Sequence, residues 1–111
     1  MDTKVNLMTY NTFTFMTEAQ MLLFIKIWED NGTKLFDKLK TKGCTRFCLN
    51  QIWNVKGTFK ASVLFEYDGP NAFKQCQVEL ENFTKNIIKE LQAADPVIEA
   101  SRNIVLQDLR V

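Results

Sequence analysis

The fold of this chain is most constrained by the order in which strand-like and helix-like patterns of apolar residues follow one another. Apolar residues recur at every second position in three of four strand-like segments, as in half-buried strands, and at every third or fourth position in two helix-like segments. The strand-like segments are 5–15, 44–54, 58–67 and 103–111, and the helix-like segments are 17–42 and 70–91. This order predicts one α+β domain over residues 1–111, strand–helix–strand–strand–helix–strand, with an antiparallel sheet of order 4-1-3-2 and two helices on one face.

The first helix has a defined start and end in the sequence. Thr17 followed by Gln20 forms a capping-box pattern, and Gly43 is a suitable C-terminal cap. Asn31-Gly32 could form a turn, but the apolar stripe keeps its phase across Gly32, which favours one continuous helix with the glycine on its buried side. The segment 21–28 is apolar on more sides than one sheet can cover, which indicates a second contacting surface.

The turn between the second and third strands determines their register. A two-residue turn at 56–57 would place Phe47 opposite Glu66, whereas a three-residue loop at 55–57 produces chemically matched pairs throughout. The pairs expected for the longer loop are Trp53 with Phe59, Leu49 with Val63, Phe47 with Phe65 and Arg46 with Glu66. We therefore expect the longer loop, with Trp53 on the apolar side facing the helices.

The second helix is expected to start at Pro70, which suits the first helical position. Its stripe of apolar residues is narrow, as in a helix that lies on a sheet, and it is interrupted at Asp95-Pro96. The segment 96–101 could form one more turn before the last strand at 103–111.

Composition excludes several classes of function. The chain carries 14 basic and 13 acidic residues, so it lacks the basic surplus that binding to nucleic acid or an acidic membrane surface would favour. Its longest unbroken apolar run, 21–25, is far too short to span a bilayer, and its first residues do not resemble a signal peptide. Three cysteines, an odd and sparse number, indicate free thiols in a reducing compartment, so we expect a cytoplasmic protein.

The sequence contains no histidine, which restricts its chemistry further. Histidine-dependent nucleophilic catalysis, histidine-ligated haem and most zinc sites are thereby excluded. Cys44 and Cys48 would lie about 13 Å apart on a strand at ~3.3 Å per residue, too far to share a zinc ion or a disulfide. We therefore expect no metal and no cofactor.

In layout, the chain resembles the dimeric α/β-barrel superfamily, whose members have a ferredoxin-like fold. The resemblance rests on a first helix of roughly 25 residues ending at Gly43, the hairpin after it, and a second helix followed by a final strand. It implies a homodimer in which the open sheet faces, away from the helices, enclose a cavity. Members of this superfamily include cofactor-independent monooxygenases that use Asn, Trp, Tyr and Arg.

The open sheet face is the candidate binding surface, because apolar and polar side chains are mixed there. We expect a small apolar or aromatic ligand in a cavity between the sheets. Its candidate contacts are Tyr10, Arg46, Cys48, Asn50, Ser62 and Glu66. The alternatives are a monooxygenase-like enzyme acting on a small aromatic substrate, a purely structural dimer, and an open face that is simply solvated. RNA binding is disfavoured, because the open face of the third strand presents Thr58, Lys60 and Ser62 instead of stacking aromatics.

Overall fold

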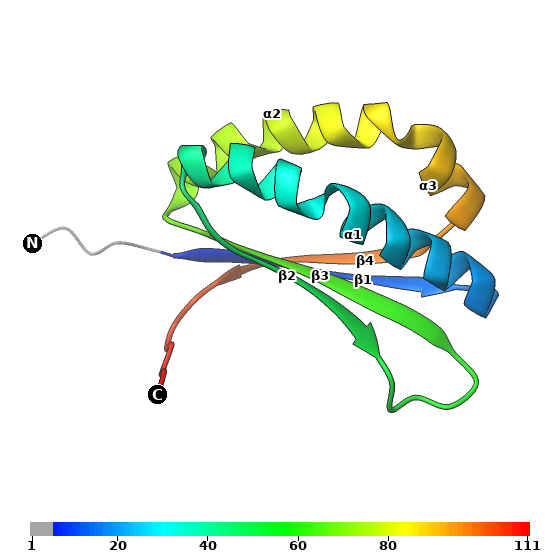
Figure 1. The fold of residues 1–111 in the computed structure, drawn as a ribbon. Helices are drawn as coiled ribbons and strands as arrows, with labels where there is room; N and C mark the ends of the chain where they lie inside the picture. The colour runs from blue at the N-terminus through cyan, green and yellow to red at the C-terminus, as the bar shows by residue number, and fades with distance from the viewer. Residues whose placement is uncertain (1–5) are drawn as a thin grey trace, which may run out of the picture.

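A computed structural model describes residues 6–111, so Val5, expected to begin the first strand, lies outside the described residues. The strands are β1 (Leu7–Phe15), β2 (Cys44–Ile52), β3 (Phe59–Tyr67) and β4 (Val97–Ile104). The helices are α1 (Glu18–Leu39), α2 (Pro70–Asn86) and α3 (Ile88–Ala94), with a 3-10 turn η1 (Lys40–Lys42). The strands form one antiparallel sheet of order β2-β3-β1-β4, and the helices cover one of its faces (Figure 1). The expected ferredoxin-like plan is confirmed, since this order is 4-1-3-2 read from the other edge.

Helix α1 is continuous through Asn31-Gly32, as the phase of its stripe predicted. At its start, the Thr17 hydroxyl accepts a hydrogen bond of 3.1 Å from the backbone N–H of Gln20. Gly32 is buried, and a side chain there would lie 3.1 Å from Cε1 of Phe47, so the glycine lets β2 approach the helix closely. Gly43 follows η1 with φ +97°, the left-handed conformation of a helix cap.

The register of the β2–β3 hairpin is confirmed over most of its length. Phe47 pairs with Phe65, Leu49 with Val63 and Arg46 with Glu66, and an irregularity between Cys44 and Arg46 shifts the register at the other end. The expectation that Trp53 pairs with Phe59 and enters the core is wrong. Strand β2 ends at Ile52 and Trp53 is 87% exposed. The tip of the β2–β3 hairpin extends away from the helices (Figure 1), in agreement with the exposure of Trp53.

The last strand begins earlier than the sequence predicted. It occupies Val97–Ile104 instead of 103–111, and the extra turn considered at 96–101 does not form. Asp95 adopts a left-handed conformation with φ 48°, and Pro96 cannot continue a helix, so the chain turns directly into pairing with β1. All eight residues of this edge strand are exposed, so it lacks the alternation of buried and exposed residues that identifies a half-buried strand.

The core fills the space between the sheet and the helices. Its most completely buried large side chains include Phe24 of α1, Leu39, Val63, Tyr67 and Cys76. Helix α1 buries Met21, Phe24, Ile27 and Trp28, more than one narrow stripe. In contrast, only Ala72 and Cys76 of α2 are buried, and the other apolar residues of its stripe are half-buried or exposed. The space under α2 and α3 is therefore incompletely filled.

Candidate functional site

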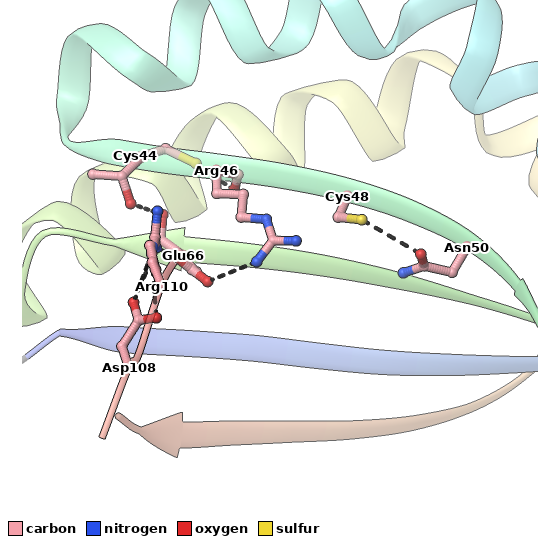
Figure 2. Close-up of polar contacts among 8 residues, drawn as sticks. Cys44, Arg46, Cys48, Asn50, Glu66, Asp108 and Arg110 are labelled. Atoms are coloured by element: carbon pink, nitrogen blue, oxygen red, sulfur yellow. Dashed lines mark hydrogen bonds and ion pairs between the residues drawn. The ribbon is translucent and has the colours of Figure 1, made fainter. Parts of the chain in front are cut away.

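The six residues expected to line a site lie on the open face of the sheet, in two small groups. In the first, Arg46 Nη1 donates to Glu66 Oε1 at 3.3 Å, and Glu66 also accepts from Arg110, which lies beyond β4 (Figure 2). The Glu66 side chain is only 12% exposed, so these two cations are its immediate environment. This arrangement suits a structural ion pair better than a proton donor.

The second group lies further along β2 and β3. The thiol of Cys48 donates to Oδ1 of Asn50 at 3.4 Å (Figure 2). Ser62, opposite Asn50 in the register, is fully buried, and its hydroxyl has no partner among the described residues. Tyr10 of β1 is 37% exposed on the same face. The role of these residues as ligand contacts stays a prediction, because it requires a second sheet facing them.

A cavity of about 550 Å³ lies on the other face of the sheet, between β1, β3 and β4 below and α2 and α3 above. This volume is within the usual range of ligand pockets, roughly 300–1,000 Å³. Most of its lining is apolar and much of it is aromatic. Phe13, Phe24, Phe65, Phe73, Leu80 and Phe83 are among its walls. The half-buried apolar stripe of α2 therefore lines a cavity and does not pack tightly against the sheet.

Several polar side chains also line this cavity. Thr9 and Asn11 enter from β1, Gln77 comes from α2, and Arg102 comes from β4. The guanidinium carbon of Arg102 lies 5.2 Å from the centre of the Phe73 ring, so the cation is stacked on the wall. This site is not evident from the sequence, because the hydrophobic pattern assigns this sheet face to the core. Thr9 and Asn11, two polar residues on the apolar side of the first strand, were the signal that could have revealed it.

Two residues that line the cavity carry buried donors without a hydrogen bond to the described residues. They are Trp28, through Nε1, and Tyr67, through its hydroxyl, and both atoms lie behind the surface of the cavity. Burial raises the pKa of Tyr67, so its hydroxyl stays protonated and can donate. Thr9 and Gln77 oppose that shift but form no well-aligned hydrogen bond with it. An unmet buried polar group costs about 1–3 kcal/mol, so a small shift of the lining that brings either donor to the surface of the cavity would let a ligand or water satisfy it.

The two buried thiols, Cys44 and Cys76, are unsuited to nucleophilic chemistry. All three cysteines are free, and burial raises the pKa of Cys44 to about 11 and also raises that of Cys76. Cys76 donates to the carbonyl of Leu39 at 3.7 Å, inside the core. Raised pKa values leave little thiolate near pH 7, which is unfavourable for nucleophilic attack. Among residues 6–111, no three His, Cys, Asp or Glu side chains gather as a metal site would require, and none of the helices there is long and apolar enough to span a bilayer.

Comparisons with known proteins place the chain by family and by fold. A family model described as a domain of unknown function (DUF6974) matches residues 4–105. Among curated proteins, none matches this sequence. The fold is similar to a dimeric ferredoxin-like protein from an uncultured marine organism, with TM-score 0.87 and 23% identity over 95% of this chain and 99% of that one. A second dimeric ferredoxin-like protein from an uncultured marine organism has TM-score 0.82 and 22% identity over 96% and 99% of the two chains.

The fold is also similar to an enzyme. SnoaB, a cofactor-independent oxygenase from Streptomyces nogalater, aligns with TM-score 0.61 and 14% identity over 94% of this chain and 96% of that one. These similarities confirm that the chain has the ferredoxin-like fold of the superfamily that its layout resembles.

Proposed function

Because the chain belongs to the DUF6974 family, a domain of unknown function, we propose a function from its own geometry: it binds a small, largely apolar or aromatic ligand. The observation that carries this proposal is the cavity between helices and sheet, whose lining includes two residues with unpaired buried donors. Apolar walls with a few orienting polar groups are typical of small-molecule sites. This places the ligand on the opposite side of the sheet from the expected cavity between two sheets.

The two unpaired donors also define what the ligand must present. Trp28 Nε1 can only donate, and Tyr67, kept protonated by burial, can donate as well. A complementary ligand therefore carries an oxygen acceptor, such as a carbonyl, on an apolar framework. A purely hydrocarbon ligand would leave both donors unpaired at the cost already described.

We also propose that two copies of the chain pair through their open sheet faces. Support comes from the fold, which resembles proteins described as dimeric, and from half-buried apolar side chains on that face, including Ile52 and Leu64. Tyr10, Arg46, Cys48, Asn50, Ser62 and Glu66 would then face the second copy. Sedimentation of the full chain at micromolar concentration should give twice the 12.9 kDa chain mass. The sparse free cysteines favour the cytoplasm as its location.

The ligand proposal predicts that one carbonyl oxygen increases affinity. In calorimetric titrations, 1-tetralone should bind about tenfold more tightly than tetralin, which has the same framework without the oxygen, since one buried hydrogen bond contributes about 1 kcal/mol or more. In a Trp53→Phe background, Trp28 becomes the only tryptophan, and quenching of its fluorescence would locate the ligand in the cavity.

A blocking variant provides the matched control. Ala100 lines the cavity from β4, and Ala100→Phe should reduce the affinity for 1-tetralone at least about tenfold by filling that space. Ala93→Phe places the same ring on an exposed position of α3 outside the cavity lining, and should bind as the unmodified chain does. Equal affinities of the two variants, or no saturable binding of 1-tetralone, would rule out this site.

A cofactor-independent oxygenase is the second candidate, and one observation favours it. Asn11, Trp28, Tyr67 and Arg102, the four residue types implied by the superfamily resemblance, all line this one cavity. An anthrone-type substrate could itself supply the electrons. One oxygen atom of dioxygen would enter the ring as a carbonyl, and the other would leave as water with the two displaced hydrogens. Arg102 would stabilise the substrate anion by its charge.

Oxygen consumption with anthrone tests this second candidate. Asn11→Ala and Tyr67→Phe should each lower the rate about 100-fold, as loss of one donor to a developing oxyanion does. Tyr10→Phe removes a hydroxyl from the opposite sheet face and should leave the rate unchanged. No enzyme-dependent oxygen uptake would exclude the reaction while leaving ligand binding intact. Equal losses in all three variants would exclude this cavity as its site.

A further inference from the structure

The segment that follows β4 leaves the sheet on the side opposite the helices (Figure 1). Its first residue still continues the ladder, because the N–H of Val105 donates to the carbonyl of Asn6 at 3.0 Å. Residues 106–111 then form no helix or strand. We call residues 105–111 the clasp segment.

Arg110 ties the clasp segment to the open face. Its Nη2 lies 3.3 Å from Oε2 of Glu66 on β3, and 2.9 Å from Oδ2 of Asp108 within the clasp segment (Figure 2). The hydrogen bond from Arg110 lowers the pKa of Asp108. Glu66 also pairs with Arg46 from the neighbouring strand. The four side chains form a chain of three ion pairs that alternate in sign and sum to zero, and this chain links the clasp segment to β2 and β3.

The clasp segment holds its apolar side chains in the open. Leu106 is 94% exposed and Leu109 is 83% exposed, although the next residue, Arg110, is anchored to Glu66. Large exposed apolar side chains on a segment that is anchored to the open face indicate a contacting protein surface.

We propose that the clasp segment packs Leu106 and Leu109 against the open face of a second copy of this chain. This inference rests on the proposed homodimer and names the part of the chain that holds it together. A second copy is the favoured occupant because the charge network is balanced, so two identical faces can approach about a two-fold axis without net repulsion. Each copy would cover the other's leucines in the same way. The relatives in fold described as dimeric support the same occupant.

Deletion of residues 106–111 tests the clasp. Sedimentation velocity over a concentration series should show the dimer dissociation constant rising at least about 100-fold, because the dimer loses the partial burial of four leucines, two from each copy. The double variant Leu106→Ser/Leu109→Ser keeps the full length and should show a similar rise. Val78→Ser removes a side chain that is 57% exposed on α2, in the helix layer, and should leave the constant unchanged. Circular dichroism melting confirms that each variant remains folded.

Each outcome separates the clasp from the dimer itself. A full chain that dimerises, with a deletion variant that dimerises equally well, would overturn the clasp and leave the homodimer standing. An equal loss in Val78→Ser would also overturn the clasp, because the effect would not be specific to it. A full chain that stays monomeric at about 100 micromolar would have a dimer dissociation constant well above that concentration, and this result would overturn both proposals.

Discussion

Gly43→Ala should lower the free energy of unfolding by about 3–4 kcal/mol, combining backbone strain with a steric clash. Gly43 has φ +97°, a conformation that costs a residue with a Cβ atom about 1–2 kcal/mol. The added Cβ would also lie 2.5 Å from the Cβ of Ala72, in the first turn of α2. Neither atom is at the end of a flexible side chain, so the η1–β2 connection or α2 must shift. Urea unfolding followed by circular dichroism measures the loss.

Two further variants separate strain from clash. Gly57→Ala changes another positive-φ glycine, at +77°, where a Cβ would meet nothing within 4 Å, so it should cost only about 1–2 kcal/mol. Adding Ala72→Gly to Gly43→Ala removes the opposing Cβ and should recover part of the stability. If Gly43→Ala and Gly57→Ala cost the same, the close approach of η1 and α2 contributes nothing to stability.

The free energy of unfolding should fall by about 3 kcal/mol between pH 9 and pH 11, because the folded state keeps buried groups protonated. Burial raises the pKa of Cys44 from 9.0 to about 11, and it also raises the pKa values of Cys76 and Tyr67. Above pH 9 the unfolded chain releases the Cys44 proton while the folded chain retains it. The unfolded state then binds fewer protons, so stability decreases as pH rises. Below about pH 8 this contribution is fully present.

Urea unfolding at a series of pH values under reducing conditions measures this dependence. Cys44→Ala removes one of the buried thiols and should flatten the curve between pH 9 and pH 11, although it also lowers stability at neutral pH. Cys48→Ala removes a thiol from the open face and should retain the slope of the unmodified chain. A slope that is unchanged in Cys44→Ala would show that its burial does not control alkaline unfolding.

The sequence predicted those parts of the fold in which the hydrophobic periodicity and the chemistry of the paired side chains indicate the same arrangement. The hairpin register followed from matching Phe47 with Phe65 and Arg46 with Glu66, because a slip of one residue would put a charge opposite an aromatic ring. Trp53 was misplaced because cross-strand matching does not reveal where a hairpin bends away from its covering helix. Strand β4 was misplaced because an exposed edge strand has little hydrophobic alternation to detect.

The candidate site was harder to predict than the fold. A cavity is a property of how far α2 and α3 stand from the sheet, and periodicity says only which face of a helix is apolar. The apolar stripe that includes Phe73, Leu80 and Phe83 has the same sequence pattern whether it packs tightly on the sheet or lines a cavity. Thr9 and Asn11 were informative because polar residues on a core face need partners. The open face, in contrast, was correctly identified as mixed in character.

Strand β4 is both an edge of the sheet and a wall of the cavity, through Ile98, Ala100 and Arg102. It pairs only with β1, and none of its residues is buried, so of the four strands it has the least to lose by detaching. Fraying of this one strand would open the cavity without any movement of the helices. A bound ligand that touches β4 would in turn raise the free energy of that fraying, so that occupancy and the order of the edge strand are thermodynamically linked.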